Sequence, residues 1–237
     1  MHIEGKKLKK VLNKINVLES IDISITSDNI YGLLGPNGAG KTSLFSILSG
    51  LSKPSEGEVL YDSKIVNNLS FEQRSELGVI YLPQEPSVFR ELTVEENIKA
   101  ALEAKNYDKK EIEKKLTRIS EEFDLMGIKT KKCNTLSGGQ RRRVEIARAI
   151  ALSPKVILLD EPFAGIDPLI INEIKTLIKN LKEKGIGILI SDHNVNATLD
   201  ICDFIYVINA GKVIAEGIPN EILQNEVVKK VYLGDVT

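Results

Sequence analysis

A glycine-rich segment near the start of the chain contains the residue types that bind phosphate. Gly35-Pro-Asn-Gly-Ala-Gly-Lys-Thr42 matches the pattern G-x-x-x-x-G-K-[ST] in full, after an apolar run and before a helical one. In such a segment, glycines let backbone N–H groups curl around phosphate oxygens, and the helix N-terminus adds a positive partial charge. A chance match in a chain of this length is on the order of one per cent. A nucleotide site is therefore favoured over a turn without a ligand.

The polar residues of this segment have distinct expected roles. Lys41 is expected to bridge the β- and γ-phosphates of the nucleotide, and the Thr42 hydroxyl is expected to ligate Mg²⁺. The residues predicted to bind the nucleotide here are Gly35, Pro36, Asn37, Gly38, Ala39, Gly40, Lys41, Thr42 and Ser43.

Two carboxylates end a later apolar run, Val156-Ile-Leu-Leu-Asp160, which is followed by Glu161. A strand that ends in a carboxylate is how a phosphate-loop fold holds Mg²⁺, and Asp160 is the candidate ligand. Glu161 beside it is placed to orient or deprotonate an attacking water. The alternative is a solvated pair of acidic residues after a strand, but the complete phosphate loop upstream makes the catalytic interpretation the stronger one.

A third motif, Leu136-Ser-Gly-Gly-Gln140, is expected to open a helix. Ser137 and Gln140 have the spacing of a capping box, so a well-capped helix start would explain them fully. Two adjacent glycines, however, are poor helix formers and suggest close approach of the backbone to another group. Arg141, Arg142 and Arg143 would then crowd the positive end of the helix dipole, which is unfavourable without nearby anions. The motif therefore predicts a second anion site.

Short β-rich apolar runs alternate with longer helical patterns, which is typical of an α/β fold with a largely parallel sheet. The expected strands are 30–34, 156–159 and 186–190, followed by a hairpin of 204–208 and 212–215. Residues 93–125 are charged and helix-forming, and capping-box pairs at Thr93 with Glu96 and at Asp108 with Glu111 mark two helix starts. This segment is predicted to be a helical insertion. A later helix is expected from the spacing of Ile170, Ile174, Leu177, Ile178 and Leu181.

The composition excludes several classes of protein. Lys and Arg number 32 against 33 Asp and Glu, so a general polyanion binder is not expected and nucleic acid is not a predicted partner. Apolar runs are far shorter than the ~20 residues that cross a bilayer, and no signal peptide is expected. Two cysteines, Cys133 and Cys202, cannot make a disulfide framework in a chain of this size, which favours a reducing, cytosolic setting.

The order and spacing of these motifs resemble the ATP-binding cassette (ABC) ATPases. VILLDEP begins 20 residues after Leu136, and His193 follows Glu161 by 32 residues. The resemblance implies that Gln84, in Leu82-Pro-Gln-Glu85, is the lid-loop glutamine that contacts Mg²⁺ and water. It implies that His193 is the switch histidine that contacts the γ-phosphate, and that Gly165-Ile-Asp-Pro168 links two sites of a dimer.

The resemblance also implies an architecture and partners. One cassette domain is expected over 1–237, with a mixed or parallel sheet core and an antiparallel β portion at about 1–88 and 150–237, and an α-helical subdomain inserted at about 89–149. Two ATP would be enclosed between two copies of the chain, with four residues acting in trans: Ser137, Gly138, Gly139 and Gln140. Separate transmembrane subunits would dock near Phe89 and Arg90, on the cytoplasmic face of the membrane.

Several local segments resemble the ATPases of lipopolysaccharide exporters in particular. They are Tyr81-Leu-Pro-Gln-Glu-Pro-Ser-Val-Phe-Arg90, Arg141-Arg-Arg-Val-Glu-Ile-Ala-Arg148, Glu161-Pro-Phe-Ala-Gly-Ile-Asp-Pro168, Ser191-Asp-His-Asn-Val195 and Val231-Tyr-Leu-Gly234. ATPases of branched-chain amino-acid importers share much of this pattern and are the alternative, and a cassette without a membrane partner is a third. A phosphate-loop kinase would leave LSGGQ and His193 unexplained. One departure is LSGGQ itself, because the exporter ATPases often carry LSGGE.

A second departure concerns the adenine base. Cassette ATPases usually place an aromatic residue about 25 to 30 residues before the phosphate-loop lysine. Residues 1–30 contain no Phe, Tyr or Trp, and Leu12 stands at that position. Because Leu has no π-face, weak recognition of the base is expected.

Overall fold

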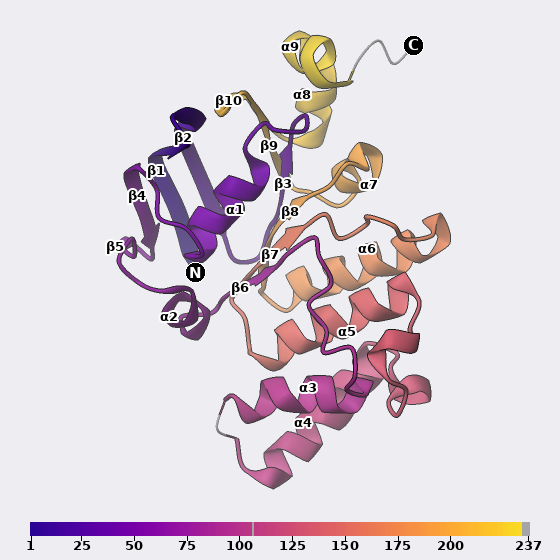
Figure 1. Ribbon diagram of the computed structural model, residues 1–237. Coiled ribbons are helices and arrows are strands. Elements are labelled where there is room, and N and C mark those ends of the chain that lie inside the picture. The colour runs from indigo at the N-terminus through magenta and orange to yellow at the C-terminus, as the bar shows by residue number, and fades with distance from the viewer. Residues whose placement is uncertain (106, 234–237) are drawn as a thin grey trace.

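Two β-sheets form the α/β part of this computed structural model, which describes residues 1–105 and 107–233 (Figure 1). Four antiparallel strands have the order β2-β1-β4-β5 and comprise β1 (His2–Leu12), β2 (Ile15–Thr26), β4 (Glu56–Tyr61) and β5 (Lys64–Ile65). Six strands have the order β10-β9-β3-β8-β7-β6 and comprise β3 (Ile30–Leu34), β6 (Val79–Leu82), β7 (Val156–Asp160), β8 (Gly187–Ser191), β9 (Phe204–Asn209) and β10 (Lys212–Gly217). The five predicted strands are all present, and the third begins one residue later than expected. Gly234, the last residue of the predicted C-terminal motif, lies outside the described residues.

The central strands of the larger sheet run parallel. β3 pairs with β8 and β9, and β7 pairs with β6 and β8, all in parallel register. Every residue of β3, β7 and β8 is buried, as expected for strands that are covered on both faces. Because parallel strands end at the same edge of a sheet, the segments that follow β3, β6, β7 and β8 meet there. These segments carry the phosphate loop, Gln84, Glu161 and His193.

The predicted helix starts are confirmed. The side chains of Thr93, Asp108 and Ser137 cap α3, α4 and α5, respectively. Each of these helices has the full capping box that its sequence indicates. The helices are α1 (Lys41–Ser49), α2 (Phe71–Glu76), α3 (Val94–Glu103), α4 (Lys109–Glu122), α5 (Gly138–Ala151), α6 (Pro168–Glu183), α7 (Val195–Leu199), α8 (Pro219–Gln224) and α9 (Glu226–Val228). Short turns of helix follow at Met126–Ile128, Cys133–Thr135 and Lys229–Leu233. Among the described residues, no helix is long and apolar enough to span a membrane.

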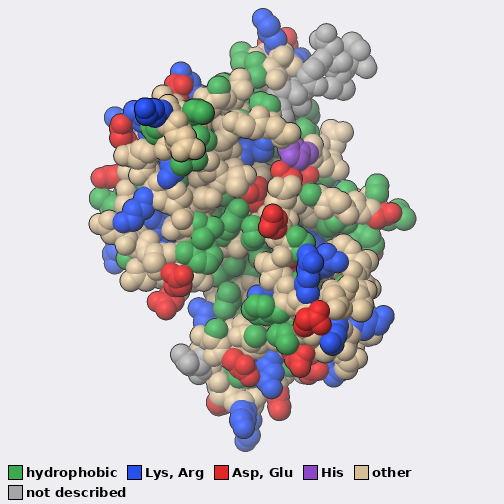
Figure 2. All heavy atoms as spheres, viewed as in Figure 1, with side chains coloured by type: hydrophobic (Ala, Val, Ile, Leu, Met, Phe, Trp, Pro, Cys, Tyr) green, Lys and Arg blue, Asp and Glu red, His purple; other side chains and the backbone are tan. Residues whose placement is uncertain are grey.

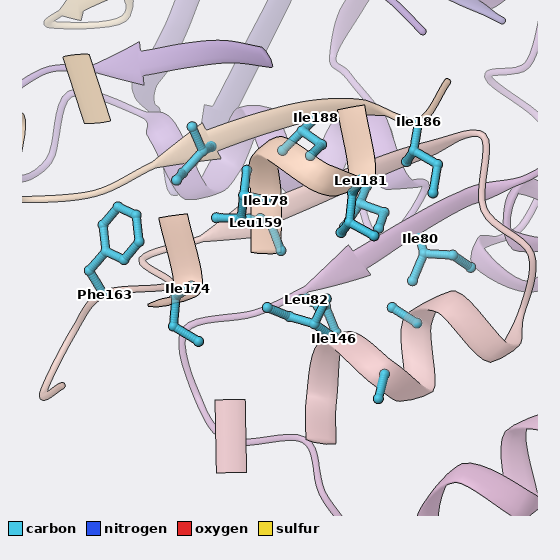
Figure 3. Packing of buried hydrophobic residues seen from close by; sticks show 14 of the residues in the cluster. Ile80, Leu82, Ile146, Leu159, Phe163, Ile174, Ile178, Leu181, Ile186 and Ile188 are labelled. Carbon is cyan, nitrogen blue, oxygen red and sulfur yellow. The ribbon is translucent and has the colours of Figure 1, made fainter. Parts of the chain in front are cut away.

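Helices α3, α4 and α5 form the predicted insertion, and α3 and α4 lie at the end of the molecule opposite α8 and α9 (Figure 1). The division of the chain at residues 89 and 149 stays a prediction. Below the sheet, α6 places Ile174, Ile178 and Leu181 against the strands, all of them buried (Figure 3). On the other side of the sheet, α1 buries Leu44 and Phe45 in a second apolar cluster. The phosphate loop thus lies between a rigid strand and a helix that is fixed by packing.

Candidate nucleotide site

The phosphate loop connects β3 directly to α1 and depends on glycine conformations. Gly38 and Gly40 have φ angles of 78° and 108°, in the left-handed region that favours glycine. At Gly40, a Cβ atom would lie 2.6 Å from Leu18 Cδ2 and 2.9 Å from the Val17 carbonyl oxygen. The loop can therefore curl against β2 only without a side chain at this position.

Lys41 is held inside this loop. Its Nζ atom donates hydrogen bonds to the carbonyl oxygens of Gly35 at 2.6 Å and Pro36 at 3.1 Å, and the residue is only 8% exposed. Burial lowers the pKa of the Lys41 ammonium, while the charges of Glu161 and Asp160 oppose that effect. The loop carbonyls and the nearby carboxylates thus place a positive charge where phosphate oxygens are expected.

A cavity of about 190 Å³ opens over the loop. Its lining brings together most of the predicted loop residues and Glu161: Val17, Asn37, Gly38, Gly40, Lys41, Thr42, Ser43 and Glu161. Leu12 is not among these lining residues. It ends β1, pairs with Ile15 across the hairpin and is 46% exposed. The sequence did not predict Val17, because an apolar residue in a strand carries no signal of a ligand site.

Asp160 is fixed by two hydroxyl groups. It is 2% exposed and accepts hydrogen bonds from Ser191 Oγ at 2.7 Å and from the Tyr81 hydroxyl at 3.2 Å. Burial and the neighbouring Asp160 charge raise the pKa of Tyr81, so the tyrosine stays a donor. A buried carboxylate that keeps further acceptor capacity is suited to a hard cation such as Mg²⁺.

Glu161 and His193 are in direct contact. His193 Nε2 lies 2.7 Å from Glu161 Oε1, and the two side chains are 50% and 12% exposed. Glu161 adopts a φ of 48°, a left-handed conformation that is strained for a residue other than glycine and typical of functional sites. Its N–H donates to the Ser191 carbonyl at 2.7 Å, which ties the ends of β7 and β8 together.

Asp192, which the sequence did not single out, holds the same two loops. It is 3% exposed and accepts hydrogen bonds from the N–H groups of Phe163 and Asn194, both at 2.8 Å. Burial raises the pKa of its carboxyl group. Its sequence signals were its position beside His193 and its place in the segment Ser191-Asp-His-Asn-Val195. Asp192 therefore fixes the loop that presents His193.

The LSGGQ motif begins α5 as predicted, but its unusual residues have partners within the chain. A Cβ atom on Gly139 would lie 2.3 Å from Ile170 Cγ2, so this glycine permits close packing of α5 on α6. Arg142 pairs with Glu145 at 2.9 Å, while Arg143 pairs with Asp124 and Glu173. These contacts account for Gly139 and Arg143, but among the described residues the buried Nε atom of Arg141 and the buried Nε and Nη2 atoms of Arg142 have no hydrogen-bond partner. The second anion site therefore stays a prediction.

Gln84 meets Glu161 at a different cavity, of about 160 Å³. That cavity also includes Gly138 of the LSGGQ motif and Gly165. None of the four LSGGQ residues from Ser137 to Gln140 lines the cavity over the phosphate loop. Glu161 thus shares one cavity with Gln84 and contacts His193, and the LSGGQ residues do not line the phosphate-loop cavity of their own chain.

Comparisons with known proteins identify a matching family and close relatives. The family model described as "ABC transporter" matches residues 18–164, and the model "Branched-chain amino acid ATP-binding cassette transporter" matches residues 212–236. The "Lipopolysaccharide export system ATP-binding protein LptB" of Haemophilus influenzae is 44% identical over 98% of this chain and 97% of its own length.

Solved structures of ATP-binding cassettes are also similar to this chain. A nucleotide-free ATP-binding cassette from an ABC transporter is 30% identical, with a TM-score of 0.89 over 99% of this chain and 100% of that one. The dimeric post-hydrolysis state of the cassette MJ0796, bound to ADP and Pi, is 28% identical, with a TM-score of 0.82 over 92% of this chain and 98% of that one.

Replacing Lys41 with alanine should weaken ATP binding by about 10- to 100-fold, because one hydrogen bond to a charged group contributes about 1.5–3 kcal/mol. Calorimetric titration with ATP checks this value. Lys53→Ala, which removes an exposed lysine, is the control and should leave the affinity unchanged. Equal affinities of the two variants would contradict the assigned role of Lys41.

Proposed function

This chain belongs to the ABC transporter family as an ATP-hydrolysing cassette, and we propose that it is the ATPase subunit of a lipopolysaccharide exporter. The observation that supports this substrate is the 44% identity to LptB over 98% of the chain. The match of residues 212–236 to a branched-chain amino-acid transporter model favours an importer ATPase as the second candidate. For either candidate, the chain would be located on the cytoplasmic face of the membrane, because ATP is supplied from the cytoplasm.

The proposed reaction is attack of water on the γ-phosphorus of ATP. The water oxygen forms a bond to phosphorus, the bond to the bridging oxygen of ADP breaks, and the water proton passes to Glu161. His193, which contacts Glu161 at 2.7 Å, would orient this carboxylate and reach the γ-phosphate. Lys41 and the loop amides would hold the charge of the β- and γ-phosphates.

Oxygen donors at the site fit Mg²⁺. Thr42 and Asp160 would hold the ion, with Gln84 as a third donor and the phosphates completing the set. Among the described residues, no group of three or more His, Cys, Asp or Glu side chains could hold a metal, so nucleotide oxygens would be required. When bound, Mg²⁺ supplies charge neutralisation for the transferring phosphoryl group.

We propose that the LSGGQ residues Ser137, Gly138, Gly139 and Gln140 act on the ATP of a second copy of the chain. Their absence from the lining of the phosphate-loop cavity and the dimeric form of the similar cassette MJ0796 support this. The N-terminus of the 14-residue helix α5 would direct a positive partial charge toward the partner's γ-phosphate. ABC cassettes form dimers, and each copy here contributes one set of motifs.

An apolar cavity of about 440 Å³ supports a docking site for the membrane subunits. It separates the sheet core from the helical insertion, and Figure 2 shows apolar side chains gathered in a hollow between these two parts. Its apolar lining includes Leu51, Phe71, Ile80, Leu82, Ala101 and Leu152. Beside it, Phe89 is 50% exposed and lies under the Arg148 guanidinium at 4.6 Å. We propose that a cytoplasmic helix of a membrane subunit docks here, against Phe89 and Arg90.

Purification of the tagged chain from native membranes tests the proposed function. Integral membrane subunits and lipopolysaccharide should co-purify with it. Recovery of a branched-chain amino-acid permease instead would favour the importer, and recovery of the chain without membrane proteins would contradict both candidates.

Glu161→Gln should bind ATP normally and lower hydrolysis by roughly 10²- to 10⁴-fold, as expected for loss of a general base. Because the nucleotide persists, an ATP-bound dimer should accumulate and be visible by size-exclusion chromatography. Glu72→Gln, at an exposed position, is the control. Turnover by Glu161→Gln close to that of the control would exclude Glu161 as the base.

Leu12→Tyr should tighten ATP binding by up to about tenfold, since stacking of a base on an aromatic ring is worth roughly 1–3 kcal/mol. The wild type should discriminate ATP from GTP only weakly, because Leu12 offers apolar area without a π-face. Titrations of both proteins with ATP, GTP and inorganic triphosphate measure the contribution of the base. A wild-type preference for ATP above tenfold that the substitution does not change would refute this role of Leu12.

Phe89→Ala should abolish recruitment to the membrane subunits while it spares the ATPase activity and thermal stability of the isolated chain. The reason is that half of the Phe89 surface is exposed and available to a partner. Leu77→Ala, at another exposed apolar residue, should keep recruitment intact. Loss of folding in Phe89→Ala would indicate instead that Phe89 packs the helical insertion.

A further inference from the structure

A buried carboxylate on α5, Glu145, lies between the cavity that contains Gln84 and the apolar docking cavity. Glu145 is 3% exposed and lines both the cavity that contains Gln84 and Glu161 and the apolar docking cavity. Its Oε1 atom accepts a hydrogen bond from the N–H of Ser87 at 2.7 Å, and its Oε2 atom accepts one from Arg142 Nη1 at 2.9 Å. Glu145 therefore contacts the segment 83–92 as well as its own helix.

The segment 83–92 connects the two sides of the molecule that the proposed function uses. Gln84 near its start faces the catalytic carboxylate Glu161, and Phe89 lies beside the docking cavity. Ser87, between them, is held at both of its backbone groups by α5. Glu145 accepts from its N–H, and Arg148 donates to its carbonyl oxygen while it also covers the Phe89 ring.

A second buried side chain holds the segment at Phe89. Asn97 of α3, which is fully buried, accepts a hydrogen bond from the Phe89 N–H at 2.9 Å and donates one to the Phe89 carbonyl at 3.0 Å. The segment is thus bound through its backbone to the helical insertion at Ser87 and Phe89, and further along the chain at Arg90 and Leu92.

These contacts fix the segment to α5. A buried carboxylate must keep its hydrogen bonds, because leaving a buried charge without partners is strongly unfavourable. One oxygen of Glu145 accepts a hydrogen bond from the segment, and the other accepts one from Arg142 of α5. The segment therefore cannot shift along the helix without breaking one of these hydrogen bonds. Helix α5 begins directly after its N-cap Ser137, so a single helix joins Glu145 to the LSGGQ residues.

We propose that Glu145 is a positioning residue that couples docking at Phe89 to the placement of the LSGGQ residues. A membrane subunit that displaces the segment 83–92 would move α5, and with it Ser137, toward or away from the partner's ATP. This inference rests on the proposed docking of a membrane subunit at Phe89. A purely structural role for Glu145, as the neutraliser of Arg142, is the competing account.

Glu145→Gln tests the proposal in the complete transporter, because glutamine retains one acceptor oxygen and can serve Ser87 or Arg142 but not both. Basal ATPase activity of the isolated chain should stay within about threefold of wild type, and recruitment to the membrane subunits should persist. Stimulation of ATPase by those subunits should fall at least fivefold, and amide hydrogen exchange of residues 84–89 should accelerate at least tenfold. Glu91→Gln, an exposed acid on the same segment that pairs with Lys132, should change neither quantity.

Arg148→Met provides a second variant that keeps the buried Arg142–Glu145 pair and removes the anchor of the Ser87 carbonyl. It should give the same loss of stimulation and the same faster exchange, and it serves if Glu145→Gln fails to fold. Faster exchange with full stimulation would overturn the proposal in favour of a structural role. If the membrane subunits neither bind nor stimulate the wild-type chain, docking at Phe89 is refuted, and this inference falls with it. If they bind and stimulate the wild type and stimulate both variants equally well, only this inference is refuted.

Discussion

The buried ammonium of Lys41 imposes the main constraint on this structure. A positive charge that is only 8% exposed needs fixed partners, and it has two loop carbonyls and the field of Asp160 and Glu161. Those partners can converge only where β3 and β7 end at one edge of a parallel sheet. The buried strands, the glycine conformations of the loop and the packing of α1 hold those partners in place.

Glu161 lies at the same edge of the sheet and is shared by two cavities. It lines the phosphate-loop cavity and the cavity that holds Gln84 and Gly138. The phosphate loop and the start of the LSGGQ helix are therefore both adjacent to this one carboxylate. The LSGGQ residues, by contrast, do not line the phosphate-loop cavity of their own chain, which supports the proposal that the cassette is half of a catalytic unit. Under that proposal, dimerisation is a condition of catalysis, and a membrane subunit would control turnover by controlling how two cassettes meet.

Residues whose roles follow from local sequence patterns could be predicted from the sequence. The phosphate loop, the carboxylates after β7 and the capping box at Ser137 are local patterns with a physical reason for each spacing. The contacts that assemble the site are not local, since Glu145 and Ser87 are 58 residues apart and Asp192 and Phe163 are 29 apart. The arginines after LSGGQ show the same limit, because the partners Asp124 and Glu173 that neutralise Arg143 are invisible to a sequence pattern.

The central claim, that each ATP site is composed of two chains, is tested most directly by mixing two inactive variants. Ser137→Arg retains an intact phosphate loop, and Lys41→Ala retains an intact LSGGQ motif. In a closed twofold dimer, an equal mixture should recover up to about a quarter of wild-type ATPase activity, because half of the dimers contain one complete site. Ser137→Arg alone should keep the ATP affinity of the monomer. A mixture no more active than its separate components, or equal loss of monomer affinity in both variants, would contradict the account.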